Sequence, residues 1–259
     1  MSGHTMPAGR LWSAYLSEIA FEFVKSLRTP AFSVPTLFFP IMFYMLFGVL
    51  LGSAGGNPKM ATYSLANYGV FGAMGPGLFG FGVSLAIERE HGLLTLKQAL
   101  PQPPGAYLLA RAAMAMLFVA IISLMLLVAA GFISKVALTP VQALQLFAIN
   151  VLGALPFCAI GLCIGTLVSG QAAPAIVNLI FLPMAFLSGL WWPLQYMPAS
   201  MQFIKDIAPV WPSYHLSQMA LGVVGEQSRG STFGHIAVLV SVTVVFFVFA
   251  MRRLARGGK

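Results

Sequence analysis

Five stretches of this 259-residue chain contain no Asp, Glu, Lys or Arg, and they decide what the chain can fold into. A helix that crosses a bilayer needs about 20 apolar residues. Four of the stretches fit one crossing each, and residues 136–204 fit two, with a turn at Ser169-Gly170-Gln171. The stretches are residues 29–58, 60–87, 112–134, 136–204 and 230–251. The pattern predicts an all-α integral membrane protein with six transmembrane helices.

Composition supports the same class, because only 8% of the residues are charged, against about 25% in an average soluble domain. We treat the chain as one membrane domain, residues 1–259. Prolines lie in or near several spans and predict either ordinary kinks or hinges for movement. The six spans are expected at about 31–52, 62–87, 107–130, 141–168, 172–190 and 234–251.

The distribution of basic residues predicts the orientation, since cytoplasmic loops are enriched in Lys and Arg. Six spans put both termini on one side of the membrane. Of the 14 basic residues, that side holds all except Lys59, Lys135, Lys205 and Arg229. We therefore expect both termini in the cytoplasm. The net charge of +8 fits loops facing anionic lipid headgroups better than a nucleic-acid interface, because the charges are thinly spread.

Residues 10–28 differ from the spans, because apolar residues recur there at helical spacing and alternate with charged ones. Glu18, Glu22 and Lys25 fall mainly on the side opposite Trp12 and Phe23. Such a helix is too charged to span a membrane. We expect an amphipathic helix in the membrane interface, the alternative being a soluble helix packed on a partner.

The loop between the second and third spans, residues 88–105, is a candidate for force transmission. Glu88-Arg89-Glu90 ends the second span, and Gly92 and a short helix-forming run, Leu93 to Leu100, follow. Prolines stop the run, and Arg111 marks the start of the third span. The alternative is a solvated loop. Paired carboxylates can also indicate acid–base chemistry, but we expect water to screen these charges and find no nucleophile nearby in sequence.

Residues 191–229 are apolar and rich in aromatics, yet prolines break them too often for one span. The pattern predicts short helices in the outer leaflet, a re-entrant segment with aromatic side chains near headgroup level. This is either an aromatic belt or an outer gate over a substrate path.

Several segments together resemble the ABC-2 type permease family of ATP-binding-cassette exporters. They are RTPAF and LFFPIMFYMLFG around span one, EREHGLLTLKQALPQPPGAYLLAR after span two, FLSGLWWPLQYMPASMQFIKDIAPVWPSYHL after span five, and the basic C-terminal tail. The similarity covers essentially the whole chain, and the drug, antibiotic and lipid-like exporters are the most similar subgroup. One departure is Leu93-Leu94 before Thr95, where many members have Thr directly after the glycine; this leaves the docking contacts undefined.

The resemblance implies a site at each end of the spans. The residues that couple to an ATPase would be Glu88, Arg89, Glu90, Gly92, Leu96 and Lys97. The resemblance also implies that Ser188, Gly189, Pro193, Met197 and Pro198 begin the outer region. Together with Trp192 and the apolar residues Phe181, Met184 and Phe186, they are our candidates for the transport path and outer gate. We expect no catalytic residue and no metal or cofactor site.

Partners follow from what the sequence lacks. There is no G-x-x-x-x-G-K-[ST] phosphate loop, so ATP and Mg²⁺ would be bound by a separate cytoplasmic ATPase subunit in two copies. By resemblance the permease pairs with a second permease subunit, a homodimer rather than a heterodimer, in the bacterial inner membrane. Membrane lipids are the other expected partner.

Other functions predict different patterns. An exporter of polysaccharide or glycolipid is the alternative within the family. An ion-coupled carrier would place ionisable residues at mid-membrane, and no span centre has one. An intramembrane hydrolase would pair Ser188 with His215 or His235 as the base. A pore or scaffold would use Asn150, Asn178 and Gln171, which could line a path or bond between helices.

Overall fold

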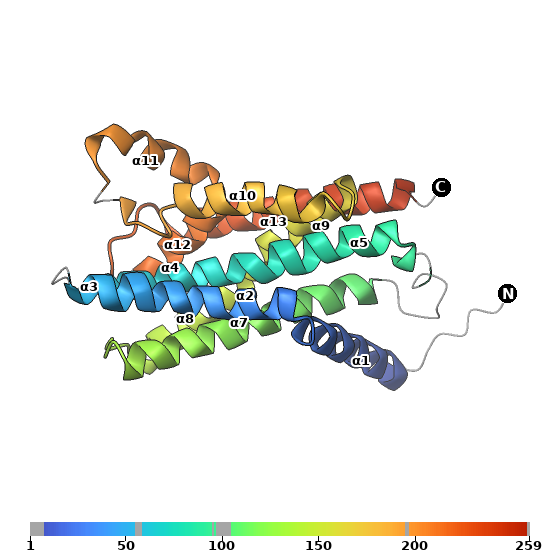
Figure 1. Cartoon of the computed structure of the whole chain (residues 1–259), viewed down its shortest axis with the longest axis horizontal. Coiled ribbons are helices and arrows are strands. Elements are labelled where there is room, and N and C mark those ends of the chain that lie inside the picture. The colour runs from blue at the N-terminus through green and yellow to red at the C-terminus, as the bar shows by residue number, and fades with distance from the viewer. Residues whose placement is uncertain (1–7, 55–58, 95, 97–104, 195–196, 258–259) are drawn as a thin grey trace.

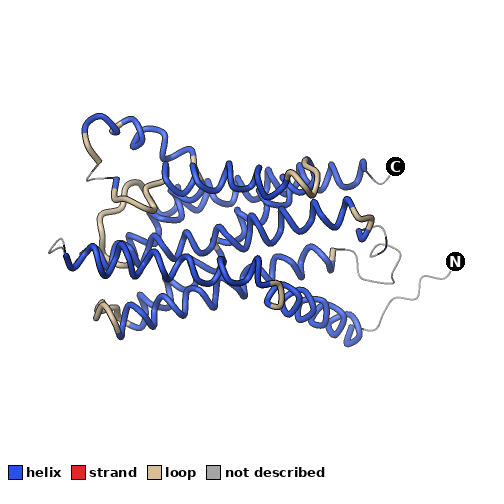
Figure 2. The backbone as a smooth tube through the Cα atoms, viewed as in Figure 1, coloured by secondary structure: helices blue, strands red, loops and turns tan. Residues whose placement is uncertain are grey.

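The computed structural model describes residues 8–54, 59–94, 96, 105–194 and 197–257, and within these ranges the chain contains helices and loops but no strand. The helices lie side by side and the loops gather at two ends (Figure 2). This confirms the expected all-helical class.

The first half of the chain forms α1 (Ala8–Leu27), α2 (Pro30–Phe43), η1 (Tyr44–Leu50), α3 (Leu51–Ala54), α4 (Lys59–Gly75), η2 (Pro76–Val83), α5 (Ser84–Glu90) and α7 (Ala106–Phe132). The second half forms α8 (Pro140–Leu152), α9 (Ala154–Leu167), α10 (Ala173–Leu187), η4 (Ala199–Met201), α11 (Phe203–Ile207), η5 (Ala208–Val210), α12 (Pro212–Val223) and α13 (Thr232–Gly257).

Within the described ranges, five helices are long and apolar enough to cross a membrane: Pro30–Leu50, Lys59–Glu90, Ala106–Phe132, Pro140–Leu167 and Thr232–Ala255. The predicted fifth span corresponds to α10, which is apolar but has only 15 residues. At 1.5 Å per residue α10 is about 22 Å long, shorter than the roughly 30 Å hydrocarbon core. The count of six therefore stays a prediction.

The start of α1 and the end of α13 lie at one end of the bundle, which we call the terminal end; α3 and α11 lie at the other, the distal end (Figure 1). Helix 59–90 is central, since 72% of its most apolar window is buried, whereas 17% is buried in helix 232–255. The predicted outer segment forms η4, α11, η5 and α12, and α12 packs against α4, α8 and α13. Whether this segment re-enters a membrane stays a prediction.

Small residues bring the central helices into backbone contact. A Cβ added to Gly161 of α9 would lie 2.4 Å from the carbonyl oxygen of Gly77 in η2, and one on Gly82 would lie 2.9 Å from the carbonyl oxygen of Gly161. Without a hydrophobic drive in lipid, close approach through small residues is a main source of helix association. These glycines therefore allow η2 and α9 to pack in direct backbone contact.

Two π-helical segments interrupt the spans near prolines. Pro76 is the first residue of η2, and Pro40 lies four residues before η1. Proline has no N–H and cannot continue the regular α-helical ladder, so the helix changes its hydrogen-bond register nearby. These positions are more than simple kinks, because π-helical turns widen the helix locally.

Candidate functional site

A buried ionic cluster lies at the terminal end, where Glu88 near the end of α5 meets side chains of α1 and α7. Its carboxylate accepts bonds from Lys25 Nζ at 2.5 Å, Arg111 Nη2 at 2.5 Å and Tyr107 Oη at 2.6 Å. The Glu22 carboxylate lies 3.5 Å from Arg111 and 3.8 Å from Lys25. Two carboxylates and two cations thus balance, which is the arrangement that makes a buried charge tolerable.

The helices place these groups through ordinary packing. α1 packs along α7, with Phe23 and Phe118 ring centroids 5.4 Å apart, and this brings its last turns over the start of α7. Arg111 lies in the second turn of α7 and reaches both Glu88 and the carbonyl oxygen of Gly80, at 2.9 Å. A carbonyl within the π-helical segment therefore receives a charged donor.

The expectation that water screens these charges is wrong for Glu88, which is only 5% exposed. Glu22, expected on the polar face of α1, is 1% exposed because it faces Arg111, itself 1% exposed. The sequence pattern showed apolar spacing but not the counter-charge that allows an acid to be buried. Sequence reasoning used Arg111 for the span boundary and the orientation and placed Lys25 on the polar side of the amphipathic helix, and so missed their pairing with Glu88.

Arg89 closes the end of a different helix. Its guanidinium donates to the carbonyl oxygens of Thr166, through Nη1, and of Val168, through Nη2 at 2.7 Å. These carbonyls are at the C-terminal end of α9, where helix carbonyls lack partners and the helix dipole favours a cation. Arg89 therefore ties α5 to α9.

Glu90 reaches the turn between α9 and α10. Its Oε2 atom accepts a bond from the backbone N–H of Gly170 at 2.6 Å, although the residue is exposed. A Cβ at Gly170 would lie 2.7 Å from that oxygen, so glycine permits the contact. The three consecutive charges 88–90 thus bind three different parts of the chain.

The other predicted coupling residues lie just beyond α5. Gly92 has φ +72°, a left-handed conformation that favours glycine, and it lets the chain turn after α5. Leu96 is exposed. Lys97 and most of the expected short helix 93–100 lie outside the described residues.

The predicted outer-gate pair Ser188-Gly189 ends α10 at the distal end. Gly189 has φ +78°; its N–H donates to the carbonyl of Phe186, and the next N–H, of Leu190, donates to the carbonyl of Ala185. This is a Schellman C-cap, in which glycine adopts the left-handed position at low cost. Ser188 Oγ bonds the carbonyl of Met184 at 2.6 Å and Ser213 Oγ at 2.5 Å, which joins α10 to α12.

Tyr63 of α4 holds this turn from the side, since its hydroxyl donates to the carbonyl oxygen of Gly189 at 2.9 Å. Sequence reasoning missed Tyr63, which lies in none of the quoted segments, and gave no role to Ser213, because only the fold brings these two residues to the turn.

Aromatic rings fill the space behind the turn. The Phe181 centroid lies 5.1 Å from that of Phe71 and 5.5 Å from that of Phe79, and Trp191 stands 6.4 Å from Phe71 and from Phe186. Of the other predicted gate residues, Met184, Pro193 and Met197 are buried, while Trp192 and Pro198 are exposed. The structure thus gathers Phe181, Phe186 and Trp191 around one apolar region.

The contacts bear on two alternative functions. Ser188 bonds to Met184 and Ser213 among the described residues, while His215 and His235 bond to each other, so the serine–histidine pair of a hydrolase is not formed. Asn150 Nδ2 bonds Ser123 Oγ of α7 at 3.1 Å, an inter-helix contact rather than a path lining. Within the described ranges no three His, Cys, Asp or Glu side chains gather as metal ligands would.

Residues 14–221 match the family model described as ABC-2 type transporter. The chain belongs to the ABC-2 type transporter family. It is also similar to the Bacillus subtilis (strain 168) protein named "Putative transport permease YvfS", with 28% identity over 232 residues, 88% of this chain and 92% of that protein. The match to the ABC-2 family includes α5 with its three charges and the Ser188-Gly189 turn. An ABC-2 family member with several apolar spanning helices is a multi-pass membrane transport permease rather than an enzyme.

Proposed function

We propose that this chain is the membrane permease of an ATP-driven exporter, that a separate ATPase subunit supplies the energy, and that the cargo is an amphipathic drug-like or lipid-like molecule. In this proposal the terminal end faces the cytoplasm of a bacterial cell, across the inner membrane. Two permease chains form a homodimer above two ATPase subunits, which bind the ATP and Mg²⁺.

The observation that carries the proposal is that one central helix joins the two candidate sites. Helix 59–90 has Tyr63 near one end, bonded to the Gly189 turn, and Glu88, Arg89 and Glu90 at the other. Force applied after residue 90 would reach α1, α7 and α9 through these three charged side chains. The same helix would carry displacement to the outer turn.

The π-helical segment η2 is the position at which we expect this helix to change its hydrogen-bond register. It lies between the two sites, and its carbonyl at Gly80 is held by Arg111. π-helical turns occur frequently at functional positions. We expect ATP-driven closure of the ATPase to press on residues 91–104, shift the charged end of α5 and open the turn at residues 188–189.

The apolar region behind that turn supports an amphipathic cargo. Phe181, Phe71, Phe79 and Trp191 line it, and a strictly hydrophilic molecule would leave its polar groups without partners there. Reconstituted complexes that move a hydrophilic polysaccharide but no amphipathic dye would contradict this cargo class. They would favour the polysaccharide-exporter alternative.

The direct test is co-purification and reconstitution. The chain should co-purify with a soluble P-loop ATPase encoded beside it, and proteoliposomes with both should export an amphipathic fluorophore only when ATP is present. A catalytically inactive ATPase is the control. Transport by the permease alone, without ATP, would overturn the proposal in favour of a carrier.

A substitution in α5 tests the coupling end. Glu90→Ala should leave the chain folded and inserted, because Glu90 is exposed, but lower ATP-driven transport, because the Gly170 contact is lost. Glu90→Gln, which keeps an acceptor for the Gly170 N–H, is the matched control and should retain most transport. Wild-type transport by Glu90→Ala would argue against a coupling role.

A further inference from the structure

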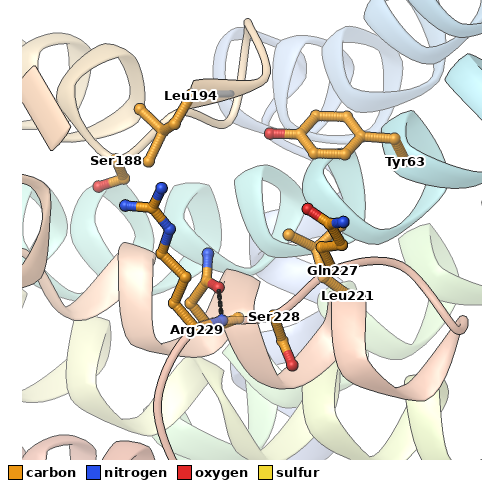
Figure 3. A pocket seen from close by; sticks show the side chains of 8 residues that line it. Tyr63, Ser188, Leu194, Leu221, Gln227, Ser228 and Arg229 are labelled. Carbon is orange, nitrogen blue, oxygen red and sulfur yellow. Dashed lines mark hydrogen bonds between the residues drawn. The ribbon is translucent and has the colours of Figure 1, made fainter. Parts of the chain in front are cut away.

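A polar pocket opens at the distal end, between α4, the end of α10, α12 and the loop before α13 (Figure 3). Its volume is about 240 Å³, below the roughly 300–1,000 Å³ typical of drug-sized sites. It therefore suits a small group rather than a whole cargo molecule. The lining residues are Tyr63, Ser188, Leu194, Gln218, Leu221, Gln227, Ser228 and Arg229.

The charge in the pocket is positive. Arg229 extends its guanidinium toward Ser188 (Figure 3), and among the described residues this guanidinium has no hydrogen bond or ion pair. None of the lining residues is acidic. Glu226 lies beyond the lining, near enough to act electrostatically on Tyr63. Arg229 is exposed, and its guanidinium presents five N–H donors in a planar fork and no acceptor, so the ligand that matches it best is an oxyanion.

The backbone of Arg229 is fixed on both sides, although the residue lies in a loop. Its N–H donates to Gln218 Oε1 of α12 at 2.7 Å, and its carbonyl oxygen lies 2.7 Å from His235 Nε2 of α13. Two side chains from two helices thus hold one loop residue, which reduces the entropy lost when its side chain binds a ligand.

The histidine that holds Arg229 belongs to a hydrogen-bonded pair. His235 Nδ1 lies 2.8 Å from His215 Nδ1, and His215 Nε2 lies 2.8 Å from the carbonyl of Pro209. Each ring therefore has one nitrogen toward a backbone carbonyl oxygen and the other toward the second ring, so the pair ties α12 to α13 beside the loop of Arg229.

We propose that this pocket is a binding site for a single phosphate or carboxylate group, held by the Arg229 guanidinium with help from the polar side chains around it. The group could belong to a lipid headgroup or to a free anion, and the test separates these sources. Binding is measured on the full-length permease without ATP or ATPase. A negative result would remove this site and leave the proposed transport function standing.

The experiment titrates the purified full chain in detergent with phosphatidylglycerol, with zwitterionic phosphatidylcholine, or with sodium phosphate, at low ionic strength. Native mass spectrometry counts bound lipid, and isothermal titration follows phosphate. Arg229→Gln should weaken binding of the anionic probe by about tenfold or more, since a charge-assisted bidentate contact is lost. Lys205→Gln removes an equal charge from α11, outside the pocket lining, and should leave binding unchanged.

The outcomes separate cleanly. Arg229-dependent binding of phosphatidylglycerol that phosphate does not displace assigns a lipid headgroup. Arg229-dependent binding of phosphate itself assigns a free anion. No binding of either anionic probe, or equal binding by wild type and Arg229→Gln, overturns the proposal. Unfolding midpoints of both variants check that they fold, and Arg229→Lys, which keeps the charge but loses the planar fork, should bind with intermediate affinity.

Discussion

Replacing Glu88 by leucine should strongly destabilise the protein, and the structure indicates how much. Arg111 is 1% exposed and cannot regain water when its partner is removed, whereas Lys25 is 42% exposed at its side chain and can. Removing one member of a buried ion pair costs about 3–5 kcal/mol. Tyr107 also loses its acceptor. We therefore expect Glu88→Leu to lower the free energy of unfolding by about 3–5 kcal/mol.

The double variant Glu88→Leu, Arg111→Met tests whether the loss of stability comes from leaving Arg111 buried without Glu88. Replacing a whole buried pair by apolar residues of similar size is often close to neutral. Glu22 and Lys25 remain 3.8 Å apart and can still pair, while the Gly80 carbonyl loses a donor at a cost of about 1 kcal/mol. The double variant should therefore be more stable than Glu88→Leu alone.

Equilibrium unfolding in mixed micelles, with increasing denaturing detergent, measures these differences. Lys25→Met is the matched control and should cost about 1 kcal/mol or less, because exposed pairs contribute little. If the double variant loses the sum of the two single losses or more, Glu88 and Arg111 are not coupled and the account of the cluster is wrong.

Three further predictions concern other parts of the fold. Gly161→Val should prevent stable folding, since its Cβ meets backbone 2.4 Å away, whereas Gly131→Ala, with no atom within 4 Å, should be neutral; fluorescence-detected size exclusion compares their yields. Burial lowers the pKa of His215; the hydrogen bond to the Pro209 carbonyl opposes this shift, and the electrostatic effect of His235 adds to it. Folding therefore favours the neutral imidazole, and this contribution to stability is present above about pH 6.5 and is lost as the pH falls through the lowered pKa. Unfolding midpoints should fall at acid pH, less so in His215→Asn, and His91→Asn, at an exposed site, should follow wild type. Tyr63→Phe removes the hydroxyl bonded to the turn at residue 189 and should reduce transport with little change in insertion; unchanged transport would show that this bond does not gate.

The helical class could be predicted from sequence, because charge-free stretches of about 20 residues have few alternatives to spanning helices. The helix end at Ser188-Gly189 was not predicted, although glycine after an apolar run is typical of a C-cap. The ionic cluster was not visible. Glu22 and Arg111 are far apart in sequence, and each has a sensible interfacial interpretation on its own.

Helix length also left open whether α10 crosses the membrane. The apolar run is continuous in sequence, but Gly189 ends the helix after 15 residues, so a window of hydropathy overestimates its span. The contact between the two histidines also could not be predicted from the sequence. His215 and His235 were considered only separately, each as a possible base for Ser188, and only the packing of α12 on α13 brings their rings together.

The charged side chains at residues 88–90 are used in contacts within the chain, and this bears on mechanism. If the charges 88–90 served only to keep a loop in water, they would not need partners in α1, α7 and the α9–α10 region. Each contact adds a constraint, so the end of α5 cannot move without displacing at least one neighbour. A chain that depends on a partner's movement needs such a rigid connection, because a flexible loop would absorb the displacement before it reached the spans.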